Sequence, residues 1–376
     1  VRGTADSSPD TRKEYTVHPA FTDETSIGFK NGGWDSELTG IWVAKFEAGF
    51  ADIGEQVEST VKYTQSTCLI NGKETESGND VWTDARNIYG KYDTNTNMTY
   101  PVFQGLKISY NYITLSDAYT LCKSIVKTNN IYGLEEDANS HLIKNSEWGA
   151  VSYLGQSQYG LNGTNIYVNN VNINSSTKSG YAVTGVCGTD EGNNTYDVNS
   201  NPTITLDIKK RNANNVKSWN INDGTKSSSS GTIYGIYDFS GGVAERVAAY
   251  IDNGNQNLYY GESFTSNEIK RSTQYYTIYK YKEPEDSGGN SGIENKKYNI
   301  NLKEKIYGDA ILETSEIAEI NETNFFFGDY AAFPSLYNPF FNRGGKWREG
   351  IYSGLFSYLR NDGTANYDSG FRAVLV

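Results

Sequence analysis

The sequence predicts an α+β protein: one large domain with two main helices, short and mostly antiparallel strands, and large loop insertions. Two segments place apolar residues at helical spacing, and several short apolar runs bounded by glycine are typical of strands. A chain of 376 residues can bury a sizeable core as one domain or as two to three small ones. Because no internal repeat and no clear linker interrupts it, we predict a single elaborated domain.

The first residues are polar, and we predict a flexible arm at 1–14 followed by the domain at 15–376. Polar stretches rich in Asn, Ser, Gly and Thr are too long for ordinary connections. We therefore predict insertions near 51–80, 155–230 and 252–322. The second insertion must contain strands of its own, such as Thr203–Ile208.

The apolar run Leu38–Glu47 predicts a core strand. Alternation places Ile41 and Val43 on one face, and Trp42 and Phe46 on the other. Because both faces are largely apolar, we expect this strand to be central in its sheet.

The first helix is predicted at 114–126. Its apolar residues form a stripe at helical spacing, and Thr114 or Ser116 can cap its N-terminus.

The second helix is predicted at 144–154. Asn145 or Ser146 is the expected N-cap, and Trp148 and Val151 are expected to face the core.

The charge of the chain argues against two classes of partner. It carries 45 acidic and 33 basic residues, a net charge of −12, without a clustered basic footprint. We therefore expect no binding to nucleic acid or to an anionic membrane. No run of about twenty apolar residues is present, so we expect no direct membrane insertion. Any secretion or anchoring segment is expected upstream of the first residue, which is not Met.

The composition suits an extracellular protein rich in strands or loops. There are 30 Tyr, 15 Phe, 6 Trp and 38 Gly residues. Tyr combines an apolar ring with a polar tip, so it can pack in a core or contact a hydrated ligand.

Cysteine and histidine offer little for catalysis or metal binding. The three cysteines (Cys68, Cys122 and Cys187) show no zinc-ligand spacing. A Cys68–Cys122 bridge and buried free thiols both remain open. The two histidines, His18 and His141, are too few to favour a zinc site or a histidine-based triad.

The C-terminal segment, residues 342–376, combines glycines and apolar residues at both ends with aromatic and charged residues between them. This pattern predicts short strands in the core that present a recognition loop. The aromatic run Asn324–Phe341 is expected to pack beneath it.

Five segments in order resemble the formylglycine-generating-enzyme-like (sulfatase-modifying factor) branch of the C-type lectin fold. They are Trp42–Glu47, Asp117–Cys122, Leu142–Trp148, Gly235–Glu245, and the pair Arg343–Trp347 with Gly370–Arg372. The resemblance implies that fold. The enzymes of the family carry redox cysteines in the C-terminal segment, whereas this chain has no cysteine after Cys187. We therefore expect no enzymatic activity and no catalytic residues.

The chain looks closer to non-catalytic members, namely variable proteins of diversity-generating retroelements and surface or prophage proteins of Gram-positive bacteria. In the variable proteins the C-terminal segment is the binding site. The resemblance thus implies exposed ligand-binding positions at Arg348, Glu349, Ile351, Tyr352, Ser357, Tyr358, Arg360, Asn361, Asp362, Asn366, Tyr367 and Asp368.

The resulting expectation is an extracellular binding protein on a bacterial cell surface or virion, with a protein or glycan as ligand. The alternative is a structural subunit of a filament, phage tail or coat that associates with itself. Glu147 and Glu245 are expected to be buried carboxylates that brace loops. We expect no metal and no cofactor, with Ca²⁺ at Asp238 and Glu245 as the one alternative because oxygen ligands suit that ion.

Overall fold

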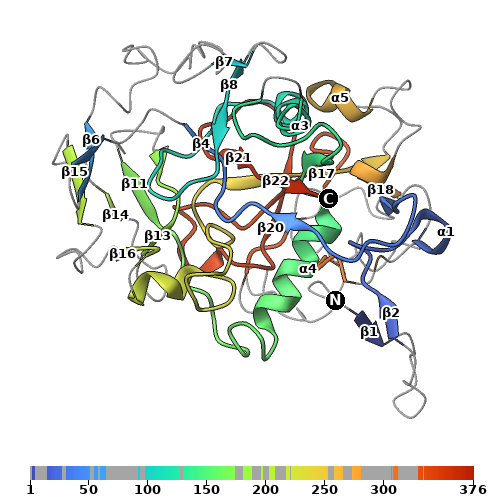
Figure 1. Cartoon of the computed structure of the whole chain (residues 1–376), viewed down its shortest axis with the longest axis horizontal. Coiled ribbons are helices and arrows are strands. Elements are labelled where there is room, and N and C mark those ends of the chain that lie inside the picture. Colours follow the sequence, from blue (N-terminus) through green and yellow to red (C-terminus); the bar gives the residue numbers. More distant parts are fainter. Residues whose placement is uncertain are drawn as a thin grey trace.

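The protein is known from a computed structural model, whose central feature is a mixed sheet around strand β17 (Ala244–Asp252) (Figure 1). The structure describes residues 2–4, 15–27, 31–50, 55–57, 60–64, 92–93, 98–127, 130–173, 181–188, 196–197, 203–207, 217–220, 222–252, 258–265, 273–280, 306, 308–311, 329–332 and 334–376. The sheet has the order β18-β17-β19-β20, and β21 also pairs with β17. Its other strands are β18 (Thr277–Lys280), β19 (Phe340–Arg343), β20 (Tyr358–Asn361) and β21 (Ser369–Phe371). β17 runs parallel to β18 and β21 and antiparallel to β19, and β19 runs antiparallel to β20.

Strand β17 is buried on both faces because it lies between two hydrophobic clusters. Ala248 and Tyr250 belong to the cluster that includes helix α3 (Leu115–Ser124). Val247, Ala249 and Ile251 belong to the cluster that includes helix α4 (Asn145–Gln156). This period-2 alternation places the sheet between the two helices, as Figure 1 shows. The mixed α+β class predicted from the sequence is therefore correct.

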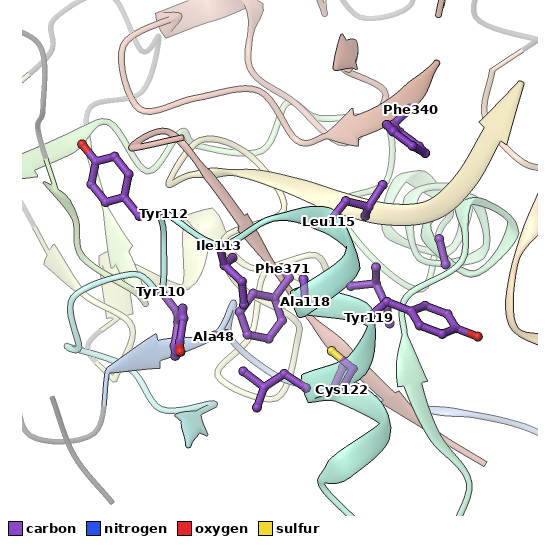
Figure 2. Close-up of a cluster of buried hydrophobic side chains, with 14 of the residues drawn as sticks. Ala48, Tyr110, Tyr112, Ile113, Leu115, Ala118, Tyr119, Cys122, Phe340 and Phe371 are labelled. Atoms are coloured by element: carbon purple, nitrogen blue, oxygen red, sulfur yellow. The ribbon is translucent and has the colours of Figure 1, made fainter. Parts of the chain in front are cut away.

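Helix α3 (Leu115–Ser124) confirms the first predicted helix. Of the two candidate caps, Thr114 is the N-cap, because its hydroxyl accepts the backbone N–H of Asp117 at 3.1 Å. Figure 2 shows Ala118 and Cys122 on the face of α3 that lies toward Phe371.

Helix α4 (Asn145–Gln156) confirms the second predicted helix, but the predicted cap is wrong. The N-cap is Lys144, whose backbone N–H donates to the Glu147 carboxylate at 2.8 Å. Asn145 is the first helical residue, and its amide donates to the Tyr279 hydroxyl at 2.8 Å. The Asn145 side chain therefore serves a tertiary contact instead of a cap.

The prediction of a central core strand at Leu38–Glu47 is also wrong. Only β3 (Trp42–Val43) is extended, and it lies at the edge of the sheet β10-β22-β3. The other strands of this sheet are β10 (Ser140–Leu142) and β22 (Ala373–Leu375). Trp42 is 79% exposed, so this apolar residue does not lie in the core.

The predicted insertions contribute small sheets. Strands β5 (Glu55–Val57) and β6 (Thr60–Thr64) of the first insertion form one sheet with β15 (Thr203–Asp207) of the second. The strand predicted at Thr203–Ile208 is thus confirmed, and the two insertions pair with each other. Within the predicted arm, Arg2–Thr4 form β1, which pairs with β2 (Tyr15–Val17).

The remaining elements of the described ranges are short. The paired strands are β4 (Gly49–Phe50) with β9 (Pro101–Val102), β7 (Tyr92–Asp93) with β8 (Met98–Thr99), β13 (Val186–Cys187) with β16 (Lys217–Ser218), and β11 (Val171–Ile173) with β12 (Tyr181–Ala182) and β14 (Tyr196–Asp197). The short helices are α1 (Glu24–Ile27), α5 (Glu262–Thr265), η4 (Asn222–Ser227), η5 (Tyr259–Gly261), η6 (Thr273–Tyr275) and η8 (Gly350–Tyr352). Among the described residues, no helix has the length and apolar character needed to cross a bilayer.

Trp148 on α4 supports a stability prediction. Its ring stacks on Phe239 at 3.8 Å between centroids, and its indole N–H donates to the Leu355 carbonyl at 2.8 Å. We expect Trp148→Ala to lower the free energy of unfolding by about 3–5 kcal/mol, because it removes a buried ring and leaves a cavity. Urea denaturation measures the loss, and the exposed Leu154→Ala on the same helix, expected to cost under about 1 kcal/mol, is the control. Equal losses for both variants would contradict this account of α4.

Candidate binding surface and the buried network beneath it

The C-terminal segment is fixed at its first end by Arg343, which is fully buried. Its guanidinium donates to the Asn145 side-chain oxygen at 3.1 Å and to the Ala310 carbonyl at 3.2 Å. Gly344 follows with φ +84°, and a Cβ there would lie 3.2 Å from the Trp148 ring. Glycine is therefore required where the segment leaves β19 against α4.

Two glycine pairs far apart in the sequence then meet through their backbones. The N–H of Gly241 donates to the Gly344 carbonyl at 2.9 Å, and the N–H of Trp347 donates to the Gly242 carbonyl at 2.8 Å. These bonds join the start of the C-terminal segment to the loop before β17.

Arg372 fixes the other end of the segment. Its guanidinium donates to both carboxylate oxygens of Glu245, at 2.9 and 2.5 Å. It also donates to the carbonyls of Ala44 at 2.6 Å and Tyr237 at 2.7 Å, and lies 4.7 Å from the centroid of the Phe239 ring. Arg372 and Glu245 are both fully buried. Such a pair is tolerated only with this degree of hydrogen bonding.

Three buried carboxylates share this region with one guanidinium. Glu47 accepts hydrogen bonds from Ser109 and, at 3.2 Å, from the Val243 N–H. Asp238 accepts the Gly185 N–H at 2.8 Å and the Asn169 amide at 2.9 Å. We call Glu47, Asp238, Glu245 and Arg372 the buried acid cluster.

Burial raises the pKa of every carboxyl group in the buried acid cluster. The pKa of Glu245 rises to about 7 and that of Asp238 to about 6, although Arg372 lowers both. The pKa of Glu47 lies well above its usual range because of burial and the neighbouring Asp238 and Glu245.

The oxygens of Asp238 and Glu245 proposed for Ca²⁺ accept hydrogen bonds from protein donors. No group of three or more His, Cys, Asp or Glu side chains within the described ranges is placed to hold a metal ion.

Glu147 braces the start of α4, as the sequence predicted. It accepts the Lys144 N–H at 2.8 Å and lies 2.9 Å from Nε2 of His141. Burial alone would raise the pKa of Glu147, but His141 and Lys144 lower it below its usual value. Glu147 and Glu245 are therefore both buried structural carboxylates.

The solvent-facing part of the C-terminal segment contains a charged cluster around Asp368. This carboxylate lies 2.9 Å from Nζ of Lys346 and 2.8 Å from Nη2 of Arg348. Arg348 also donates to the Tyr367 hydroxyl and is 43% exposed, whereas Asp368 is 1% exposed. Asp368 thus serves as an internal counter-ion that holds two cationic side chains at the surface.

The exposure predicted for the candidate binding residues is correct only in part. Arg348 is exposed. The half-buried positions are Glu349, Tyr352, Arg360, Asn361, Asp362, Asn366 and Tyr367. Ile351 lies in η8, and its side chain is outside the described part of the structure.

Ser357, Tyr358 and Asp368 are buried, so their predicted exposure is wrong. The Ser357 carbonyl accepts the Gly344 N–H at 3.2 Å. Tyr358 lies in β20 with its ring 5.6 Å from the guanidinium of Arg343. These side chains support the surface from below and cannot contact a ligand directly.

Arg246 holds the turn at 361–364 from below. This fully buried side chain donates to the Asn361 side-chain oxygen at 2.9 Å and to the Thr364 carbonyl. Gly363 has φ +85°, and Asp362 accepts the Thr364 N–H at 3.0 Å. Burial lowers the pKa of Arg246 to about 10, while Asp362 and Asp368 partly offset this. No sequence pattern had marked Arg246 as a support for the surface.

Tyr259 and Tyr260 extend this surface and were missed in the sequence. Tyr259 is 71% exposed and Tyr260 38%, with their ring centroids 5.2 Å apart. A Cβ at Gly363 would lie 2.8 Å from the Tyr260 Cβ, so the tyrosine pair borders the turn. They lie in the predicted insertion near 252–322, and the only signal was the Tyr-Tyr-Gly sequence itself.

The described part of the run 324–341 packs beneath the C-terminal segment, as predicted. The N–H of Tyr330 donates to the Tyr352 carbonyl at 2.9 Å, and the N–H of Ala332 donates to the Tyr358 carbonyl at 2.9 Å. Buried Asp329 accepts the Phe356 N–H at 2.9 Å.

Cys122 and Cys187 are free and buried, so the Cys68–Cys122 bridge is not formed; Cys68 itself lies outside the described residues. Burial raises the pKa of Cys187 to about 12 and that of Cys122 well above its usual value. Both side chains are therefore protonated thiols at neutral pH, which are poor nucleophiles.

The fold and this surface define a mixed α+β protein whose C-terminal segment is fastened by buried arginines. Comparison of the sequence with known protein families and with curated proteins finds no match.

The buried acid cluster predicts how stability depends on pH. In the folded state its carboxyls keep protons that the unfolded chain releases at about pH 3.8 for Asp238 and about pH 4.5 for Glu47 and Glu245. The folded state therefore binds more protons from there up to about pH 7, and stability falls as the pH rises through this window. Glu47→Gln preserves the acceptor for Val243 without an ionisable group. We expect this variant to lose less unfolding free energy between about pH 5 and pH 8 than the wild type, by about 1 kcal/mol or more.

Chemical denaturation across this pH range measures the difference. The exposed Glu262→Gln is the matched control and should follow the wild-type pH dependence. Parallel curves for wild type and Glu47→Gln would contradict the assignment of a raised pKa to this carboxyl.

Proposed function

We propose that the protein is a non-enzymatic extracellular binding protein that presents its C-terminal segment to a protein or glycan ligand. The observation that carries this proposal is the contrast between the two sides of the segment. Its ends and inner side are fastened by Arg343, Arg372 and Arg246. In contrast, Arg348 is exposed, and so is Tyr259, whose ring packs on Tyr260 at the turn 361–364. Holding a surface rigid before binding reduces the entropy lost on association.

The chemistry of this surface suits recognition. Tyr259 and Tyr260 supply large rings with few rotatable bonds, and Arg348 and Arg360 supply directional donors. Binding surfaces concentrate such residues because they give contact area at a low entropic cost.

We further propose that the fold is the formylglycine-generating-enzyme-like branch of the C-type lectin fold. Several motif residues that carry the resemblance meet in one buried network: Arg372 contacts Glu245 and Phe239, and Phe239 stacks on Trp148. Gly344 lies against the same Trp148 ring. Motifs that are distant in the sequence and converge on one structural centre support a shared fold.

The non-enzymatic assignment rests on the thiol chemistry. The chain has no cysteine in the C-terminal segment, where the enzymes of that family carry theirs. Display on a bacterial cell surface or virion, the location proposed here, agrees with the aromatic and glycine-rich composition.

The test uses arrays of purified glycans and of extracellular protein domains probed with the full chain. We expect wild type to bind a subset of spots, and the double variant Tyr259→Ala/Arg360→Ala to lose about tenfold in affinity for them, since anchor side chains carry most binding energy. Trp42→Ala, which removes an exposed aromatic residue on the edge strand β3, is the control for general loss of aromatic surface.

Light scattering and negative-stain imaging of the same samples distinguish a binding protein from the alternative, a structural subunit that associates with itself. Discrete particles with selective binding support the proposal. Absence of binding to every spot, or unchanged binding by the double variant, would refute it, and ordered polymers would favour a structural subunit of a filament, tail or coat.

A further inference from the structure

A second exposed surface lies on two loops that carry no charged residue. The neutral loop pair, residues 154–165 and 227–236, consists of apolar, glycine, hydroxyl and amide residues only. In a chain with 21% charged residues, a set of this size would contain about four or five charges by composition alone. The two loops themselves are therefore neutral within a protein of net charge −12, and Lys226, which directly precedes the second loop, is paired with Asp223 at 3.8 Å.

The two loops contact each other and are fixed by backbone hydrogen bonds. A Cβ at Gly155 would lie 3.1 Å from the Ser229 carbonyl oxygen, and one at Gly231 would lie 3.7 Å from the Leu161 side chain. The Leu161 N–H donates to the Gly155 carbonyl at 2.6 Å, and the Ser229 N–H donates to the Ile236 carbonyl at 2.8 Å. Each loop thus has a defined backbone before any ligand binds.

Two aromatic side chains project from this fixed backbone. Tyr159 is 78% exposed and Tyr234 is 87% exposed, and exposed Leu154 and Ile233 accompany them. Both rings bury little of their surface within the domain, so their faces are accessible to a ligand on loops whose backbone is already fixed. Exposed amide and hydroxyl side chains lie on the same loops: Gln158, Asn162, Thr164 and Thr232.

We infer that the neutral loop pair binds a neutral carbohydrate by stacking sugar rings on Tyr159 and Tyr234. The C–H face of a pyranose is apolar and suits an aromatic ring, while its hydroxyl groups need amide and hydroxyl partners. A surface without charges binds such a ligand without the cost of desolvating an ion. The fixed loops keep the entropic cost low as well.

Other occupants fit this surface less well. An anionic polymer would find no cation on these loops, and the flanking Lys226 already pairs with Asp223. Protein interfaces also favour tyrosine, but the exposed amide and hydroxyl side chains of the neutral loop pair match the hydroxyl groups of a sugar, and the test below detects a second copy of the chain as the rival occupant. The inference is independent of the proposed role of the C-terminal segment, since it depends on different side chains.

Native affinity electrophoresis of the full chain tests the inference, with laminarin, galactomannan or soluble starch in the gel. We expect at least one of these neutral polymers to retard the wild type. Tyr159→Ala and Tyr234→Ala should each weaken the interaction about tenfold, as loss of an aromatic anchor does. Tyr234→Phe, which keeps the ring, should retain most of the binding, and Trp42→Ala, which removes an exposed aromatic residue outside both proposed surfaces, should bind like the wild type.

Three outcomes would overturn the inference. The first is no retardation by any of the neutral polymers, and the second is retardation only by polygalacturonate, an anionic polymer. The third is self-association, seen by light scattering, that Tyr234→Ala abolishes, because the surface would then contact a second copy of the chain. Both alanine variants change exposed side chains, so an unchanged midpoint of thermal unfolding shows that the fold is intact.

Discussion

The ion pair between Arg372 and Glu245 is the interaction on which the remaining structure depends. Arg372 lies between β21 and β22, so it connects the sheet around β17 to the sheet β10-β22-β3. Its remaining donors reach the carbonyls of Ala44 and Tyr237, which belong to two further segments. A buried ion pair contributes little net stability by itself, but a partner left alone is costly. The pair and the two carbonyl contacts therefore act as a constraint that holds three distant segments, around Ala44, 235–245 and Arg372, in one arrangement.

The same principle extends to the surface above it. Buried Arg246 and Asp368 support the C-terminal segment from below, each by contacts with side chains or carbonyls that lie nearer the solvent. The inner charges thus determine where Arg348 and the turn at 361–364 lie. This fixed arrangement suits the binding role proposed for the surface.

The sequence predicted those parts of the fold whose signal is local. Helices α3 and α4 followed from apolar spacing, and Glu147 and Glu245 were predicted as buried carboxylates that brace loops within the motif segments. Positions decided by tertiary contacts were not predictable. The resemblance implied that Tyr358 contacts a ligand, but its ring lies beside Arg343. The alternating pattern predicted Trp42 in a core strand, although it is on an exposed edge strand. Likewise, only the fold brings Tyr260 next to Gly363.

A double-mutant cycle on Arg372 and Glu245 tests the central claim most directly. The free energy of unfolding is measured at about pH 8 for Arg372→Met, Glu245→Leu and the double variant, because Glu245, with a pKa of about 7, is then mainly ionised. We predict that Arg372→Met alone costs about 3 kcal/mol or more, and that the double variant is more stable than the sum of the single losses by about 1–3 kcal/mol. Additive losses would show that the two side chains act independently, and would contradict the view that this pair organises the C-terminal segment.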